Sequence, residues 1–289
     1  MRGRLAPTPT GLLHVGHART FAVARARATG GLVLRIEDLD RSRCRPEYVA
    51  AAVEDLRWLG FDWAEGPDVG GPHGPYVQSD RGGWHLEVWR RLEAAGAIYP
   101  SPHSRRDVEA AASAPQEPRP DDEPEEPVFP PSLRPQAWDR APAPGGVAWR
   151  FRVPDGRTIT FDDGRAGRVA RTAGVDFGDF VVWRRDDLPA YELAVVADDH
   201  AMQIGEVVRG EDLLTSTARQ ILLYETLGWP IPALFHVPLV RDAQGRRLAK
   251  RAGGLSIREL RDRGFAPADV LEAPLARMGL ASATQPRAG

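Results

Sequence analysis

The chain has 289 residues, a net charge of −2 and a hydrophobic share of 42%. This length is sufficient for one large domain or two ordinary ones, each with a buried core. The charge excludes a globally basic protein, so any contact with nucleic acid must use local positive charge. A single cysteine, Cys44, excludes an internal disulfide and a zinc site built from several cysteines. Because the sequence shows neither a long apolar run nor a signal peptide, we expect a cytoplasmic protein that does not enter a membrane.

The N-terminal part of the chain predicts alternating strands and helices. A short strand begins at Arg4 and ends at two closely spaced prolines, and residues 32–38 form an apolar strand with an acidic end. A helix over residues 17–30 has apolar side chains at helical spacing and a stop at Gly30. A second helix runs from Pro46 to Gly60. This order predicts an α/β fold with a doubly wound, Rossmann-like parallel sheet.

The middle of the chain has a different composition. Ten of the 26 prolines lie between Pro115 and Pro144, together with an acidic cluster at residues 121–126. Such a segment cannot bury apolar surface, so we expect residues 114–145 to be disordered or a loose loop. The stretches 147–153 and 158–163 alternate like strands, and we expect them to pair as a hairpin through Pro154, Asp155 and Gly156. This region is interpreted as an inserted α+β subdomain.

The α/β pattern resumes after the insertion. It predicts a strand at residues 179–186, a helix at 217–228 and a strand at 235–240, followed by short helices after Ser256 and Pro267. Ser256 and Glu259 have the spacing of a capping box. The expected division is a first catalytic half at 1–98, the insertion at 99–178 with its Pro-rich loop at 114–145, a second catalytic half at 179–241, and an ATP loop with C-terminal helices at 242–289.

Two histidines, His14 and His17, stand in the turn before the first helix. They could bind a metal together with Asp38 and Asp40, although a zinc site needs three or four ligands and no spacing requires this set. They could also be ordinary histidines of a turn. A third interpretation is a phosphate site, because the free N–H groups and the dipole of a helix N-terminus attract anions. In this interpretation the pair shares one helix face and Gly16 leaves room for a nucleotide.

A basic cluster lies in the glycine-bounded stretch 245–254. Its members are Arg246, Arg247, Lys250 and Arg251. By itself the cluster is typical of a solvated basic loop. Beside a phosphate site it could act as a mobile clamp that neutralises a leaving pyrophosphate.

These motifs resemble those of a known family. HVGH at residues 14–17 is similar to the HIGH signature of class I aminoacyl-tRNA synthetases, and RLAKR at 247–251 resembles their KMSKS loop, with Lys250 matched. The blocks RLAPTPTG, RIEDLD, AYELAVVADD and EVVRGEDL resemble the glutamyl branch of that family, in the same order. Only 39 residues follow Lys250, which we expect to be too few for the anticodon-binding domain of a full glutamyl-tRNA synthetase. Within the branch, the chain is therefore similar to the truncated glutamyl-Q group.

The resemblance implies a class I synthetase catalytic domain and ATP-dependent activation of L-glutamate, with Mg²⁺ accompanying the ATP. It implies transfer of the glutamate to the queuosine base of tRNA(Asp) by a monomer. One alternative is a glutamyl-tRNA synthetase-like fragment that charges a tRNA 3′ end. Another is a non-catalytic module that binds tRNA or nucleotide, which the altered loop with Ala249 and Arg251 leaves open.

The resemblance also assigns the site residues. Arginines at the glutamate site suit a carboxylate, and Glu37 suits an ammonium group. Three ordinary roles stay open beside these: Glu37 could pair with an arginine, Tyr191 could belong to the core, and Arg209 could form a surface ion pair. The catalytic residues are His14, His17 and Lys250, and these three bind ATP together with Gly16. The glutamate-binding residues are Arg4, Leu5, Ala6, Pro7, Thr8, Glu37, Tyr191 and Arg209.

The insertion departs from the family pattern at its zinc site. Many members bind zinc there through a Cys-x-Cys and a Tyr-x-x-x-Cys motif. The matching positions are Ser101, His103, Phe129 and Leu133, which offer one possible ligand in four. We therefore expect no zinc, and an insertion that is held by packing or is partly loose.

Overall fold

The structure is a computed structural model that describes residues 1–111, 127–240 and 256–272. The chain divides into two compact units. The first comprises Met1–Asp80, Ile204–Asp212 and Ala233–Gly289, and the second comprises Arg81–Gln203 and Leu213–Pro232. Each unit is therefore built from segments that are distant in the sequence. Among the helices of the described ranges, none has the length and apolar character needed to cross a membrane.

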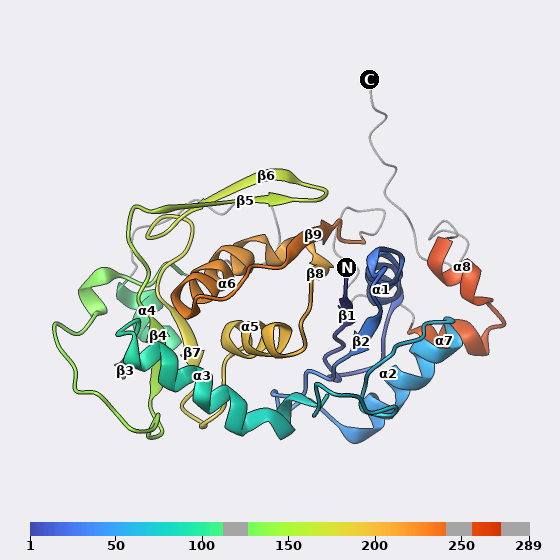
Figure 1. The fold of residues 1–289 in the computed structure, drawn as a ribbon, viewed down its shortest axis with the longest axis horizontal. Helices are drawn as coiled ribbons and strands as arrows, with labels where there is room; N and C mark the ends of the chain where they lie inside the picture. The colour runs from blue at the N-terminus through green and yellow to red at the C-terminus, as the bar shows by residue number, and fades with distance from the viewer. Residues whose placement is uncertain (112–126, 241–255, 273–289) are drawn as a thin grey trace. The chain divides into compact units, whose positions relative to one another are not determined.

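The first unit contains short parallel strands with helices between them (Figure 1). β1 (Gly3–Leu5) pairs in parallel with β2 (Leu32–Leu34), and β8 (Glu206–Gly210) pairs in parallel with β9 (Ala233–Val237). The carbonyl of Arg2 accepts hydrogen bonds from the amides of Gly205 and Glu206, so β1 and β8 are neighbours. The helices are α1 (Val15–Arg27), α2 (Pro46–Trp58), α7 (Ile257–Asp262) and α8 (Pro267–Glu272). A short 3-10 helix, η1 (Gln78–Arg81), follows at the boundary.

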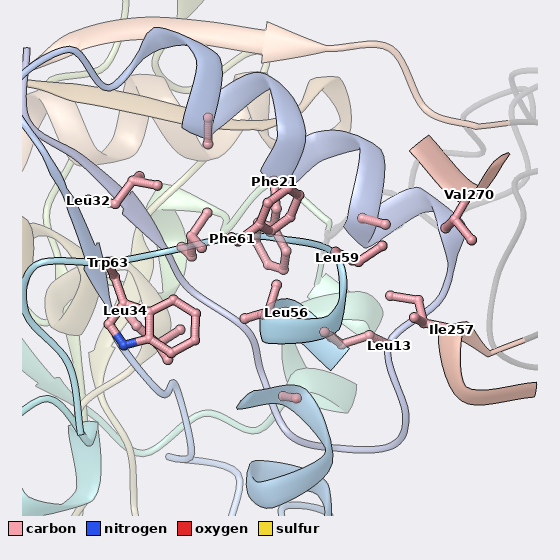
Figure 2. Close-up of a cluster of buried hydrophobic side chains, with 14 of the residues drawn as sticks. Leu13, Phe21, Leu32, Leu34, Leu56, Leu59, Phe61, Trp63, Ile257 and Val270 are labelled. Atoms are coloured by element: carbon pink, nitrogen blue, oxygen red, sulfur yellow. The ribbon is translucent and has the colours of Figure 1, made fainter. Parts of the chain in front are cut away.

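A hydrophobic cluster fills the space between these strands and helices (Figure 2). Apolar side chains at helical spacing on α1 and α2 meet Leu5, Leu32 and Leu34 of the strands. Ile257 of α7 and Val270 of α8 belong to the same cluster. The face of the strands that carries Leu5, Leu32 and Leu34 is therefore apolar and packs against helices.

The second unit contains an antiparallel sheet, a hairpin and four helices within its described residues. β4 (Ala148–Phe151) is the central strand between β3 (Ile98–Ser101) and β7 (Phe180–Trp183). β5 (Thr158–Asp163) and β6 (Gly167–Thr172) form the hairpin. The helices are α3 (Gly82–Ala94), α4 (Arg105–Ala111), α5 (Tyr191–Ala201) and α6 (Leu214–Leu227), with the 3-10 turn η2 (Pro131–Leu133). A further 3-10 turn, η3 (Glu211–Leu213), begins in the first unit and ends at the first residue of the next segment of the second.

The predicted α/β class, with parallel strands and intervening helices, is confirmed. The Ser256–Glu259 capping box is also confirmed, at the start of α7. The division at residues 98, 178 and 241 stays a prediction.

The predicted hairpin between residues 147–153 and 158–163 is wrong. A turn is present, because the amide of Arg157 donates to the carbonyl of Pro154, but the flanking strands enter different pairings. All four residues of β4 are buried, and the strand has a partner on each edge. β5 instead turns back through Asp163, whose carboxylate accepts hydrogen bonds from the amides of Arg165 and Ala166. A buried strand cannot be told from a hairpin arm by alternation alone, because both are apolar at every second position.

The expected loose loop at 114–145 also needs correction over its described part, residues 127–145. Phe129 is buried, and Leu133 and Trp138 pack against the cluster to which it belongs. The indole nitrogen of Trp149 donates to the carbonyl of Pro144 at 2.9 Å. Prolines remove backbone hydrogen-bond donors, but a few aromatic side chains hold this part of the loop in place by packing and hydrogen bonding. Residues 112–126 lie outside the described residues.

Candidate active site

Five polar side chains lie buried on one face of the strands of the first unit. Side chains alternate along a strand, and Leu5, Leu34, Ile36, Val208 and Val237 all belong to the hydrophobic cluster. The residues between them must point to the opposite face. They are Arg4, Arg35, Glu37, Arg209 and His236, each at most 8% exposed. Because a buried polar face is costly unless its groups have hydrogen-bond partners, we take this face as the candidate site and ask which partners its side chains have.

Arg4 and Arg209 lie on strands that are neighbours. The Nη1 of Arg4 donates to the carbonyl of Val208 at 2.9 Å. The Nε of Arg209 donates to the Nε2 of His236 at 3.2 Å, and Arg209 and His236 are register partners in β8 and β9. Because Arg209 is 5% exposed, its expected alternative as a surface ion pair is wrong. Two guanidinium groups thus lie near the carboxyl ends of parallel strands, where open α/β sheets bind ligands.

Glu37 lies just beyond the end of β2 and pairs with Arg35. The Oε1 of Glu37 accepts hydrogen bonds from Nη2 of Arg35 at 2.9 Å and from Nε at 3.3 Å. The amide of Glu37 donates to the carbonyl of Pro7 at 3.0 Å, which extends the parallel pairing of β1 and β2 past the strands. The arginine partner considered from the sequence is therefore present, and it holds the carboxylate in place on the polar face.

His14 and His17 form the N-terminal cap of α1. The Nδ1 of His14 accepts a hydrogen bond from the amide of Gly16 at 3.1 Å, and the Nδ1 of His17 accepts one from the amide of His14 at 3.3 Å. The ring centroids are 3.8 Å apart. This is a capping box made by two imidazoles, and it places both rings at the positive end of the helix dipole.

The cap also selects a tautomer for each ring. A nitrogen that accepts a hydrogen bond carries no proton, so a neutral ring must carry its proton on Nε2. His14 and His17 therefore each present an Nε2–H donor while their Nδ1 atoms hold the helix end. The phosphate interpretation of the pair requires donors of this kind.

Gly16 is required by the cap itself. A Cβ at this position would lie 2.9 Å from Cε1 and 3.0 Å from Nδ1 of His14, closer than real Cβ contacts. The His14 ring therefore borders the space that was expected for a nucleotide at Gly16. The main effect of the missing side chain is that the His14 ring can reach the amide of Gly16.

The described chain resumes after residue 255 directly beside this cap. Ser256 forms an antiparallel bridge with His14, and the amide of Ile257 donates to the carbonyl of Leu13 at 2.8 Å. The histidine turn thus holds the residues that follow the basic cluster at 245–254. Lys250 itself lies outside the described residues.

Other site residues expected from the sequence take different positions. Thr8 is exposed, whereas the side chain of Leu5 is fully buried in the hydrophobic cluster, so only its backbone could contact a ligand. Ala6 is partly buried and Pro7 is buried. Tyr191 begins α5 of the second unit and is 40% exposed, so its alternative as a core residue is wrong.

The metal interpretation of the histidine pair has no support in the described residues. The carboxylate of Asp38 accepts hydrogen bonds from the amide and hydroxyl of Ser79, and that of Asp40 accepts them from Ser42 and Arg43. These bonds lower the pKa of Asp40, that from Ser42 most of all. Within residues 1–111, 127–240 and 256–272, no three His, Cys, Asp or Glu side chains gather as a metal site would require.

The four positions that match the zinc ligands of other family members make contacts of a different kind. Ser101 accepts a hydrogen bond from the Nε of Arg150 at 3.3 Å, and the Arg150 guanidinium lies 4.4 Å from the centre of the Phe129 ring. Phe129 is buried with Tyr99 and Val108, and Leu133 packs against them. His103 has its ring 6.4 Å from that of Phe129. An aromatic cluster therefore occupies these positions.

Sequence reasoning missed Arg35 and His236. The alternation of RIE (residues 35–37) after the apolar strand places Arg35 on the same face as Glu37, so the period of two could have found it. His236 stands in an ordinary apolar strand, and only its pairing with β8 identifies it.

Comparison with known proteins identifies the family to which the chain belongs. The family model of class I tRNA synthetases (E and Q), catalytic domain, matches residues 1–286. The chain is 47% identical over 276 residues to a glutamyl-Q tRNA(Asp) synthetase of Symbiobacterium thermophilum, covering 93% of this chain and 84% of that protein. It is 42% identical over 290 residues to a glutamate–tRNA ligase 2 of Nitrosococcus oceani, covering 96% of this chain and 59% of that protein.

A solved structure gives the same result for the fold. The glutamate–tRNA synthetase of Elizabethkingia anophelis matches with a TM-score of 0.70 and 29% identity, over 92% of this chain and 54% of that chain. The chain therefore belongs to the family of class I tRNA synthetase catalytic domains for glutamate and glutamine.

Proposed function

We propose that the protein activates L-glutamate with ATP and transfers it to the queuosine base of tRNA(Asp). The observation that carries the proposal is the polar face of Arg4, Glu37 and Arg209, formed at the strand ends of the same unit that holds the histidine cap. The 47% identity to a glutamyl-Q tRNA(Asp) synthetase supports this choice within the family. Localisation in the cytoplasm and a monomeric state are part of the proposal.

Glutamate has charges that the polar face can match. The carboxylate that reacts with ATP must keep its nucleophilicity, so Arg4 and Arg209 suit the other carboxylate, on the side chain. Arginine favours such contacts because its planar guanidinium can bind a carboxylate through two hydrogen bonds. Glu37 suits the ammonium group, with Arg35 orienting its carboxylate through a hydrogen bond. Tyr191 and the backbone around Ala6 and Thr8 are proposed as further contacts on the resemblance to the family.

The proposed reaction has two steps. The α-carboxylate oxygen attacks the α-phosphorus of ATP, and the bond to the bridging oxygen breaks to release pyrophosphate, with Mg²⁺ entering as part of the nucleotide substrate. A nucleophile on the queuosine base then attacks the carbonyl carbon of the adenylate, and AMP leaves. The Nε2–H groups of His14 and His17 would donate to phosphate oxygens, and Lys250 would neutralise the pyrophosphate as its charge develops.

The first step is tested by glutamate-dependent exchange of pyrophosphate into ATP. We expect exchange with glutamate and much less with aspartate or glutamine. Absence of exchange with every amino acid would favour a non-catalytic binding module. Exchange with another amino acid but none with glutamate would refute the proposed specificity.

The second step is tested with radiolabelled glutamate and tRNA(Asp) that contains or lacks queuosine. We expect label only on the queuosine-containing tRNA, and resistant to removal of the 3′ terminal nucleotide. The relatives that are glutamate–tRNA ligases make charging of a tRNA 3′ end the second candidate. Label lost with the terminal nucleotide would establish that candidate.

Two variants separate binding from chemistry. Lys250→Ala should raise the activation free energy of exchange by about 2 kcal/mol and so lower the maximal rate. The reason is that a cation beside the phosphates stabilises the negative charge that develops on the leaving pyrophosphate. Arg209→Ala should mainly raise the KM for glutamate, since it leaves a carboxylate without its partner. An unchanged maximal rate in Lys250→Ala would assign the phosphate contact to another basic residue.

A further inference from the structure

His236 lies at the edge of the proposed glutamate site and has no role in the reaction described above. It is fully buried on β9, and its register partner on β8 is Arg209. Its neighbours Phe235 and Val237 both contact the hydrophobic cluster on the opposite face. Because side chains alternate along the strand, His236 must point to the polar face together with Arg209 and Arg4.

The hydrogen bond between the two side chains has a defined direction. The Nε of arginine always carries a hydrogen and can only donate, so the Nε2 of His236, at 3.2 Å, must accept. An accepting Nε2 carries no proton, and the neutral ring therefore has its proton on Nδ1. The imidazole is thus a neutral acceptor that contacts the edge of the guanidinium and fixes its rotation about the final bonds of the side chain.

This contact fixes the orientation of the Arg209 guanidinium. The Nε–H of the guanidinium donates to His236, so a carboxylate ligand would meet Arg209 through its Nη groups. A neutral partner also orients the arginine without cancelling its charge, which a carboxylate in the same place would do. A ring fixed between two strands reduces the rotamer entropy that an arginine would otherwise lose on binding a ligand.

We infer that His236 is a positioning residue that presents Arg209 to the side-chain carboxylate of the amino acid and so contributes to the preference for glutamate over glutamine. The inference rests on the proposed function of Arg209. It assigns no step of the reaction to His236, since the histidine contacts the arginine and acts through it.

Three substitutions of His236 test the inference by pyrophosphate exchange. His236→Gln keeps a neutral acceptor near the position of Nε2 and should raise the KM for glutamate less than threefold. His236→Leu removes the acceptor and should raise the KM about tenfold, because Arg209 is then no longer pre-oriented and must be ordered when the ligand binds. His236→Glu places a competing carboxylate beside Arg209 and should raise the KM most. In all three, kcat should change much less than the KM, and the glutamate-to-glutamine ratio of kcat/KM should fall with the rise in KM.

A matched control separates positioning from stability. Val237→Ala, on the same strand and the opposite face, removes core volume and should lower the melting temperature while leaving the KM unchanged. If His236→Leu changes only the melting temperature, or if Gln and Leu raise the KM equally, the inference is overturned.

A direct measurement does not depend on activity. In ¹⁵N NMR spectra His236 should be the Nδ1–H tautomer, with an unprotonated Nε2 whose resonance shifts in Arg209→Ala. An Nε2–H tautomer would overturn the inference even if exchange occurs. Failure of the proposed function has a different signature: the wild-type protein would show this tautomer but no glutamate-dependent exchange.

Discussion

Arg134 in the insertion of the second unit and Arg209 on the polar face of the first unit are held by different kinds of partner. In the insertion, Arg134 donates to both oxygens of Asp179 at 2.7 Å and also pairs with Asp155. Asp179 accepts two further hydrogen bonds, from the hydroxyl of Tyr99 and from the amide of Val153. On the polar face, the Nε of Arg209 instead donates to a neutral imidazole.

The difference lies in the charge of the partner, which is a carboxylate for Arg134 and a neutral ring for Arg209. Although burial lowers the pKa of Arg134, the hydrogen bonds of Asp179 and Asp155 raise it above its usual value. Burial and the bond to Asp179 likewise raise the pKa of Tyr99. Such a network fixes charges in one state and holds the insertion together around the aromatic cluster. The neutral ring of His236, by contrast, orients Arg209 without adding a negative charge beside it.

The largest expected effect comes from breaking the insertion network. Asp179→Ala should lower the free energy of unfolding by about 3–5 kcal/mol, because the half-buried Arg134, the hydroxyl of Tyr99 and the amide of Val153 all lose their shared buried acceptor. Asp155→Ala removes a carboxylate that is 41% exposed and pairs with the same arginine, so its effect should be much smaller. Denaturant unfolding of both variants provides the measurement. Equal losses would show that the network does not hold the insertion.

The first unit holds a buried carboxylate that, unlike Asp179, accepts no hydrogen bond from the described residues. Asp55 on α2 is fully buried, and neither of its oxygens has a hydrogen-bond partner among the described residues. Burial raises its pKa from the usual 3.8 to about 6, and the nearby Arg258 offsets only part of this. Between these two values the folded protein holds a proton that the unfolded chain has released. Stability therefore falls as the pH rises from about 4 to about 7.

Asp55→Asn should remove this loss, because the amide cannot ionise. The variant should be more stable than the wild type by up to about 3 kcal/mol at pH 8, with no gain at pH 4. Thermal unfolding across this pH range provides the measurement. Glu47→Gln, an exposed position on the same helix, is the control and should show no such pH dependence. A stability gain for Asp55→Asn that is the same at both pH values would contradict the assignment.

A smaller effect is expected at the histidine cap. Gly16→Ala places a methyl group against the His14 ring and should lower the maximal exchange rate about tenfold by displacing that ring. Its effect on stability should stay within about 1 kcal/mol, because alanine favours the helix while the cap is weakened. Gly82→Ala, at the start of α3, has open space for a methyl group and should leave exchange unchanged. Equal rates in the two variants would refute the role of the cap.

The smallest effect is expected from chelation. If packing and the Asp179 network hold the insertion, dialysis against a chelator should leave the melting temperature unchanged, and elemental analysis should find no stoichiometric zinc. About one zinc per chain, or a large loss of stability on chelation, would contradict this prediction.

Local patterns determined much of the fold. Helical spacing and flanking prolines or glycines predicted the helices at α1, α2 and α6, and the Ser256–Glu259 cap predicted the start of α7. These features depend on contacts within a few residues, which the order of the chain already specifies. For the same reason the spacing of the two histidines, three residues apart in a turn that leads into a helix, was enough to place them at a helix N-terminus.

Contacts between distant segments could be decided only by the tertiary structure. The pairing of β4 with β3 and β7, and the packing of Phe129 against Tyr99, depend on which surfaces remain to be buried once the other elements have formed. The bond between Arg209 and His236 joins residues 27 positions apart through the register of two parallel strands. The period of two indicates which face a side chain takes, but only the register of neighbouring strands determines which side chain it meets.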